Sequence, residues 1–160
     1  MENWSIKYII GDLVQSADNY DVIAHGCNNF CTMGRGIALA IKRRFPKAYE
    51  VDKKTRYGDI KKLGTISVAE CDNVTIVNAY IQHHYTGRDV LVEYHAVREC
   101  LREIKKRYSG KKIGLPKIGA GLAGGDFMAI ENIIKDELKG EDVTVVILNE
   151  SEWPCWISKS

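Results

Sequence analysis

The sequence lacks the features of a secreted, disulfide-bonded or membrane-spanning protein. Its five cysteines are an odd number at irregular spacing, which argues against a disulfide framework. The opening residues, MENWSIKYII, contain neither the basic segment nor the cleavage site of a signal peptide. No apolar run approaches the roughly 20 residues that cross a bilayer. We therefore expect a reduced, cytoplasmic protein that does not associate with membranes.

Proline is also rare, and the net charge is small. The sequence has only three prolines, no internal repeat and no low-complexity linker. Its net charge of +2 comes from scattered basic residues, so composition alone does not indicate binding to nucleic acid. With 45% apolar and 28% charged residues, the 160-residue chain is typical of a globular protein with a sizeable core. We expect one domain over residues 1–160, present as a monomer.

Strand-like and helix-like segments alternate along the chain. Strands are expected at 5–10, 21–25, 64–70, 74–80, 112–116 and 143–148. Helices are expected at about 36–44, 49–56, 90–108 and 126–138, with Pro46 closing the first of them. The run VTVVIL is typical of a strand buried on both faces. The alternation predicts an α/β fold, a three-layer α/β/α sandwich with a mixed, mostly parallel central sheet.

Polar and glycine-rich segments follow four of the predicted strands. They are GDL at 11–13, HGCNN at 25–29, IGAGLAGG at 118–125 and NES at 149–151. In open α/β sheets, ligands bind in the crevice at the carboxyl ends of the strands. We therefore expect the four segments to form one composite site.

Two segments place glycines between a strand and a helix. They are MGRGIA at 33–38 and GAGLAGG at 119–125, which contains Gly119-x-Gly121-x-x-Gly124. Glycine lets the backbone approach a ligand closely, and the N–H groups and the helix N-terminus that follow favour an anion. The pair of loops predicts a diphosphate held from two sides, although simple tight turns would give the same pattern.

A dinucleotide-binding fold is the second interpretation of these glycines. Glu150 lies at about the right distance to bind a ribose, as the acidic residue of that fold does. Only 12 residues follow Leu148, however, which is too few for the second half of such a fold. This interpretation therefore ranks below a fold that binds one diphosphate in a single crevice.

The order of the motifs resembles the macro domain family. The motifs are GDL, AHGCNNFCTMGRGIALAIKRRFP, LPKIGAGLAGGDF and VVILNE, and they cover nearly the whole chain. Within the family, the sequence is most similar to the small ADP-ribose 1''-phosphate phosphatases of yeast and phages. The resemblance implies binding of a small-molecule ADP-ribose derivative and hydrolysis of its phosphate without a metal or cofactor. A hydrolase that removes ADP-ribose from protein or nucleic acid, and a non-catalytic reader of ADP-ribose, remain alternatives.

The resemblance also assigns binding roles. Asp12 would accept a hydrogen bond from the adenine amino group, although an aspartate there also suits a turn or helix cap. Asn28 or Asn29 would contact the distal ribose. Trp153 would stack on the adenine or pack within the fold. The implied substrate-binding residues are Gly11, Asp12, Leu13, Asn29, Gly34, Arg35, Gly36, Ile37, Ala38, Ile118, Gly119, Ala120, Gly121, Leu122, Asn149 and Glu150.

Three residues are candidates for catalysis: Asp126, Asn28 and His25. Asp126 matches an acidic position of the resembled branch and would direct a water as general base, but it also sits where a helix N-cap belongs. His25 is expected to end the second strand beside the crevice and to donate a proton or hydrogen bond to the departing phosphate. A histidine buried within the fold is the other interpretation.

Other chemistries are disfavoured by spacing. The stretch NAYIQHHYTG lacks the lysine with which some macro domains attack the sugar, although a water-mediated removal of ADP-ribose stays open. Of His83 and His84 in this stretch, we expect one, but not both, at the cleft mouth. Cys27 and Cys31 have no second pair of ligands nearby, so we expect no structural zinc or other metal. Arg35 does not have the spacing from either cysteine that a cysteine phosphatase needs.

Overall fold

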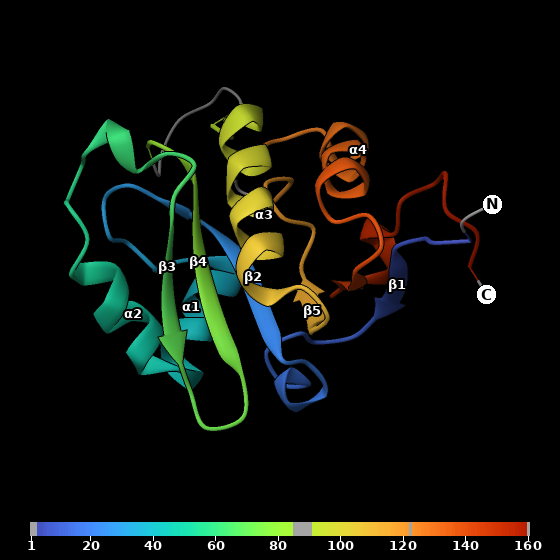
Figure 1. The fold of residues 1–160 in the computed structure, drawn as a ribbon, viewed down its shortest axis with the longest axis horizontal. Coiled ribbons are helices and arrows are strands. Elements are labelled where there is room, and N and C mark those ends of the chain that lie inside the picture. Colours follow the sequence, from blue (N-terminus) through green and yellow to red (C-terminus); the bar gives the residue numbers. More distant parts are fainter. Residues whose placement is uncertain (1–2, 85–90, 122, 160) are drawn as a thin grey trace.

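The computed structural model describes residues 3–84, 91–121 and 123–159, which form a six-stranded sheet between two layers of helices (Figure 1). The strands are β1 (Lys7–Ile10), β2 (Val22–Asn28), β3 (Ile66–Glu70), β4 (Thr75–Gln82), β5 (Lys112–Leu115) and β6 (Asp142–Ile147). The helices are α1 (Gly36–Arg44), α2 (Pro46–Lys53), α3 (Tyr94–Tyr108) and α4 (Phe127–Glu137). The predicted α/β class and the mixed sheet are confirmed.

The sheet has the strand order β1-β6-β5-β2-β4-β3. Every neighbouring pair is parallel except β3 and β4, which form the antiparallel hairpin that the sequence predicts. Because five strands run in one direction, their carboxyl ends meet at a single edge of the sheet. The loops that follow these strands are therefore brought together although they are far apart in the sequence.

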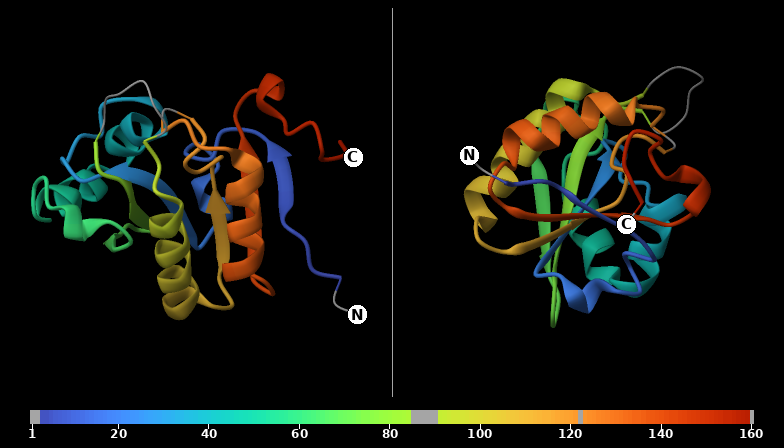
Figure 2. Two further views of the ribbon diagram at one scale, coloured as in Figure 1. Left: turned by 90° about the horizontal axis from the view of Figure 1, so that it is seen from above. Right: turned by 90° about the vertical axis from the view of Figure 1, so that its right-hand side faces the viewer.

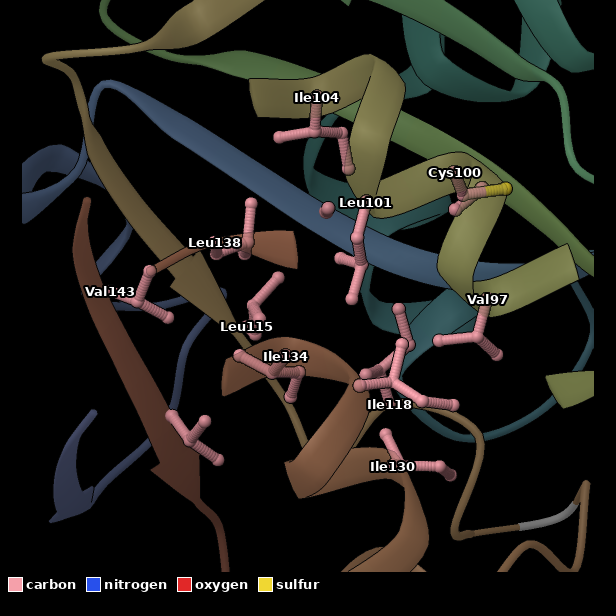
Figure 3. Packing of buried hydrophobic residues seen from close by; sticks show 14 of the residues in the cluster. Val97, Cys100, Leu101, Ile104, Leu115, Ile118, Ile130, Ile134, Leu138 and Val143 are labelled. Carbon is pink, nitrogen blue, oxygen red and sulfur yellow. The ribbon is translucent and has the colours of Figure 1, made fainter. Parts of the chain in front are cut away.

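Helices cover both faces of the sheet (Figures 1 and 2). The pair α3 and α4 packs on one face, whereas α1 and α2 pack on the other. On α3, Val97, Leu101 and Ile104 recur at helical spacing and are fully buried. Figure 3 shows Val97 and Leu101 directed toward the side of the cluster that holds Ile130 and Ile134 of α4. No helix in the described ranges is long and apolar enough to cross a membrane.

Helix α3 begins at Tyr94, later than the predicted helix over 90–108, because the residues before it form hydrogen bonds with other segments of the chain. The N–H groups of Leu91 and Val92 donate to the carbonyl oxygen of Ala123, at 2.8 and 3.2 Å, and that of Glu93 donates to Ile81 at 2.7 Å. Val92 also forms a bridge to Gln82 at the end of β4. These residues are therefore extended, and they tie the second glycine loop to the sheet. Position 90 itself lies outside the described residues.

Pro46 begins a helix, whereas the sequence prediction made it the end of one. It occupies the first turn of α2, where its missing N–H costs nothing and its fixed φ suits the helix. Phe45 alone separates α1 from α2, and its N–H still donates to Ile41 at 2.6 Å. The expected helix over 49–56 therefore starts three residues earlier and ends at Lys53.

Truncating the core of α3 should destabilise the protein strongly. Leu101→Ala removes a fully buried side chain between α3 and the sheet, so we expect the free energy of unfolding to fall by about 2–5 kcal/mol. Urea denaturation followed by circular dichroism measures the change. Ile60→Ala is the matched control, because Ile60 is 55% exposed, and it should shift stability by less than about 0.5 kcal/mol. Equal effects of both substitutions would contradict the assigned core.

Candidate functional site

A cavity of about 690 Å³ opens where the carboxyl ends of the parallel strands meet. Its lining comes from the loops after β1, β2, β5 and β6 and from the end of β4. Neighbouring strands are about 4.8 Å apart, so the row from β1 to β4 spans about 19 Å. The predicted site residues that line it are Gly11, Asp12, Leu13, Asn28, Gly34, Arg35, Gly36, Ile37, Ala38, Ile118, Gly119 and Gly121.

The first glycine loop presents backbone N–H groups to the cavity at the start of α1. The N-cap residue, Arg35, has an extended backbone and makes no side-chain capping hydrogen bond. Gly36 begins the helix at φ 55°, a conformation that glycine adopts without strain. The first helical bond is donated by Leu39 to Arg35, at 3.2 Å, so the N–H groups of the first turn are left for a ligand.

The second glycine loop is closed by its own hydrogen bonds. Ala120 donates to the carbonyl oxygen of Lys117 at 3.1 Å, and Gly125 donates to that of Gly119 at 2.8 Å. Gly119 has φ 75°, and a Cβ atom there would lie 2.9 Å from Ile130. A Cβ atom on Gly125 would lie 2.5 Å from the carbonyl oxygen of Gly119. The loop therefore requires glycine at both positions to keep its backbone against the cavity.

Asp12 marks the β1 end of the cavity. Its Oδ1 accepts hydrogen bonds from the N–H groups of Val14 and Gln15, both at 3.0 Å, so the carboxylate caps a turn. Asp12 is only partly buried and lines the cavity beside the apolar side chains of Val14 and Val146. The turn-capping and ligand-binding interpretations of Asp12 are therefore compatible, because one carboxylate oxygen is used in the turn.

Asn28, Thr32 and Gln82 lie at the opposite end. The side-chain amide of Asn28 donates to Thr32 Oγ1 at 2.7 Å, and its Oδ1 accepts from the N–H of Phe30 at 2.8 Å. Gln82 lies opposite Asn28 in the sheet, where a bulge interrupts the register between β2 and β4. Asn28 thus shapes its own loop and lines the cavity at once.

Asn29, the neighbour of Asn28, is buried outside the cavity lining. It is fully buried, and its side-chain amide nitrogen lies 3.0 Å from His83 Nδ1. Its carbonyl oxygen accepts hydrogen bonds from Lys62 Nζ at 3.0 Å and from the N–H of Gly58 at 2.7 Å. Within the described residues its Oδ1 has no partner. Of the two asparagines that the sequence proposes, only Asn28 lines the cavity.

The expectation that His25 faces the crevice is wrong. Strand β2 continues to Asn28, three residues beyond the predicted end, so His25 lies within the sheet and is 0% exposed. Asn78 donates its amide hydrogens to Ala48 and Ser67, so its Oδ1 accepts from His25 Nε2 at 2.7 Å. Burial lowers the pKa of His25 to about 4, which keeps the ring neutral near pH 7.

The second catalytic candidate, Asp126, is exposed and caps helix α4. Its Oδ1 accepts a hydrogen bond from the N–H of Met128 at 3.0 Å, and its own N–H donates to the hydroxyl of Tyr94 at 2.9 Å. Over the described part of the chain, the cavity lining does not include Asp126. The structure confirms the N-cap and leaves the catalytic role as a prediction.

Further expected site residues also fall outside the described cavity lining, namely Ala120, Asn149 and Glu150. Glu150 is exposed and pairs with Lys159 at 2.7 Å, which lowers the pKa of Glu150. Trp153 packs edge-on against Tyr8, with ring centroids 6.1 Å apart, and does not reach the cavity. The prediction for Leu122 lies outside the residues that the structure describes.

Sequence reasoning missed several residues that line the cavity. Lys117 and Glu152 lie on one flank, where Lys117 Nζ donates to the carbonyl oxygen of Glu152 at 3.0 Å. Lys117 and Arg35 bring positive charge to the two glycine loops. The signal for Lys117 is its place directly before the second loop, within LPKIG. Gln82 carries no such signal, because only the pairing of β4 with β2 brings it to the site.

Cys27 lines the cavity but is poorly suited to act as a nucleophile. It is 5% exposed, and desolvation by burial raises the pKa of its thiol well above the ordinary value. Its Sγ lies 3.6 Å from His25 Nε2, the nitrogen that already donates to Asn78. Thiolate chemistry is therefore disfavoured by environment as well as by the spacing of Arg35.

Comparison with known proteins gives consistent results. The family described as Macro domain matches residues 24–134. An uncharacterized 17.5 kDa protein of Enterobacteria phage T4 is 37% identical over 150 residues, covering 88% of this chain and 95% of that protein. An ADP-ribose 1''-phosphate phosphatase of Lodderomyces elongisporus is 27% identical over 160 residues, covering 91% and 99%. A solved structure from Bacteroides thetaiotaomicron has a TM-score of 0.79 at 30% identity, covering 92% and 100%.

Burial of His25 makes stability depend on pH. Because its pKa is lowered in the folded protein, the unfolded chain binds an additional proton between about pH 6.5 and pH 4. His25 therefore leaves the free energy of unfolding undiminished above about pH 6.5. As the pH falls toward 4, uptake of this proton by the unfolded chain lowers the free energy of unfolding by about 3 kcal/mol. Urea denaturation at pH 7 and pH 4.5 should show a smaller loss of stability in His25→Gln than in the wild type. Identical losses would contradict this assignment.

Proposed function

The chain belongs to the macro domain family, and on that premise we propose that it hydrolyses ADP-ribose 1''-phosphate to ADP-ribose and phosphate. One observation carries the proposal: two glycine loops flank a single cavity that ends at Asp12 on one side and Asn28 on the other. This arrangement fits a nucleoside diphosphate sugar lying along the sheet edge. The phosphatase among the similar proteins supports the reaction class.

The proposed ligand has its adenine at the β1 end. There the Asp12 carboxylate would accept a hydrogen bond from the adenine amino group, and Val14, Ala40 and Val146 provide apolar contact. The diphosphate would lie between the glycine loops, where backbone N–H groups and the N-terminus of α1 stabilise anionic oxygens. The distal ribose would then reach Asn28 and Gln82.

The proposed reaction is the attack of water on the phosphorus at the distal end. A bond forms between the water oxygen and phosphorus while the bond from phosphorus to the sugar oxygen breaks. The water proton passes to a base, and the departing sugar oxygen takes a proton from solvent and leaves as the hydroxyl group of ADP-ribose. The chain would contribute mainly orientation and preorganised N–H donors for the developing charge. Asp126 remains the predicted base although it lies outside the described cavity lining, and His25 is not assigned a role because it is buried within the sheet.

Phosphate release from ADP-ribose 1''-phosphate tests this function directly. We expect steady-state turnover in the wild type and at least about a tenfold lower kcat/KM in Asn28→Ala, because the loop at the distal end loses the hydrogen bonds of the Asn28 side chain to Thr32 and Phe30. ADP-ribose that binds without any phosphate release from the phosphorylated compound would refute the phosphatase and favour a reader.

The two roles of Asp126 can be separated in the same assay. Asparagine keeps the N-cap but carries no charge, whereas alanine removes both. If Asp126 is the general base, Asp126→Asn and Asp126→Ala should both lose activity, although only the alanine variant should lose stability. Full activity of Asp126→Asn would show that Asp126 acts only as the cap of α4.

Recognition of adenine at the β1 end of the cavity can be tested with an altered nucleotide. Asp12 would accept a hydrogen bond from the amino group of adenine, and a hydrogen bond to a charged group contributes about 1.5–3 kcal/mol. Calorimetry should therefore show at least about tenfold weaker binding of inosine diphosphate ribose, which has an oxygen in place of that amino group. Asp12→Asn should reduce this preference, and equal affinities in the wild type would contradict the role of Asp12.

A further inference from the structure

Three uncharged polar side chains line the distal end of the cavity, and Thr32 is the most exposed of them. Thr32 is exposed, whereas Gln82 is partly buried and Asn28 is only 8% exposed. Gln82 Nε2 donates to the carbonyl oxygen of His84 at 2.7 Å, and Asn28 Oδ1 accepts from the N–H of Phe30 at 2.8 Å. Both amides are therefore partly used within the chain, and the Thr32 hydroxyl is the most accessible of the three groups to a ligand.

The Thr32 hydroxyl has a hydrogen to donate. Its Oγ1 accepts a hydrogen bond from Asn28 Nδ2 at 2.7 Å. The N–H of Phe30 donates to Oδ1 of the same amide, which fixes the amide nitrogen on the side of Thr32. A hydroxyl group carries one hydrogen besides its two lone pairs. Among the described residues no acceptor takes the hydrogen of Thr32, so it is left for an oxygen atom of a ligand.

The backbone around Thr32 is held in place on both sides. Cys31 has φ 55°, a left-handed conformation, and the turn it makes returns Thr32 to Asn28, four residues earlier. Cys31 Sγ donates to the carbonyl oxygen of Asp52 at 3.3 Å. Met33, the next residue after Thr32, is 1% exposed and packs in the core. Thr32 thus lies between two anchored residues, and its hydroxyl is presented to the cavity at a fixed place.

The charge around Thr32 favours an anionic acceptor. The loop over residues 29–35 contains Arg35, which lines the cavity, and no acidic residue. The two carboxylates in the described lining, those of Asp12 and Glu152, belong to the segments after β1 and β6, on the opposite side of the site. A phosphate oxygen is charged, and a hydrogen bond to an ionised acceptor is about twice as strong as one between neutral groups. A phosphate therefore suits this end of the cavity better than a neutral group does.

We propose that Thr32 is a specificity-determining residue whose hydroxyl donates a hydrogen bond to the distal phosphate of ADP-ribose 1''-phosphate. This contact favours the phosphorylated compound over ADP-ribose, which presents a neutral sugar hydroxyl at the same place. Asn28 orients the Thr32 hydroxyl from within the loop. The proposal rests on the proposed function for the identity of the ligand, and it adds the residue that distinguishes the substrate from the product.

Phosphate release from ADP-ribose 1''-phosphate measures the contribution of this hydroxyl. Thr32→Val keeps the size of the side chain and removes the hydroxyl, so kcat/KM should fall by at least about tenfold. Thr32→Ser keeps the hydroxyl and should stay within about threefold of the wild type. Thr65→Val is the matched control and should leave kcat/KM unchanged. Thr65 is also exposed and its hydroxyl is bonded, to the carbonyl oxygen of Lys62 at 2.6 Å, but it does not line the described cavity.

Calorimetric titration with ADP-ribose separates recognition of the phosphate from a merely structural role of Thr32. If Thr32 only held Asn28 in place, Thr32→Val would weaken the binding of ADP-ribose by the same factor by which it lowers kcat/KM. We expect instead that the affinity of Thr32→Val for ADP-ribose stays within about twofold of the wild type. Equal losses for both compounds, or full activity of Thr32→Val, would overturn the role of Thr32.

Failure of the proposed function gives a different result. A wild type that binds ADP-ribose but releases no phosphate would refute the phosphatase, and both compounds can then be titrated without turnover. The role of Thr32 stands in that case if the wild type binds the phosphorylated compound more tightly and Thr32→Val loses this preference. It is overturned if the two compounds bind equally, or if the preference persists in Thr32→Val. Absence of binding of either compound would refute both proposals.

Discussion

The parallel alignment of five strands is the constraint on which the rest of the structure depends. It brings the ends of β1, β6, β5, β2 and β4 to one edge, so that loops more than a hundred residues apart in sequence line one cavity. Buried aliphatic side chains on both faces of the sheet fix this alignment, because a shift of one residue in register would turn them toward the wrong face. Packing of the core thus determines the geometry of the cavity.

The two glycine loops place backbone close to the cavity between its two ends. The amide hydrogens at the start of α1 are left unpaired by the helix itself, whereas several N–H groups of the second loop, such as that of Gly125, donate within the loop and fix its backbone. A backbone donor cannot change rotamer, so such a site is ordered before the ligand arrives. That favours a diphosphate, which needs several fixed donors, over a ligand recognised by long side chains.

The sequence predicts the parts of this site that depend on local pattern. Glycine spacing identifies both loops, and the change from strand to helix periodicity places them at the correct edge. The sequence does not predict the parts of the site that depend on pairing between distant segments. The strand containing His25 extends to Asn28 because β4 pairs with it along that length, and this pairing buries the histidine. Gln82 reaches the cavity only through the pairing of β4 with β2, so no local signal could identify it.

The two ends of the cavity differ in how freely their side chains can serve a ligand. Asp12 uses one carboxylate oxygen in a turn, whereas the amide of Asn28 is bonded at both its nitrogen and its oxygen within the adjoining loop. The amide of Asn28 therefore holds its loop in place, and a ligand at this end would meet an amide whose orientation is already set. Gln82, which lines the same end of the cavity, also donates a hydrogen bond within the chain, from its Nε2 to the carbonyl oxygen of His84 at 2.7 Å, so both side chains are held in place before a ligand binds.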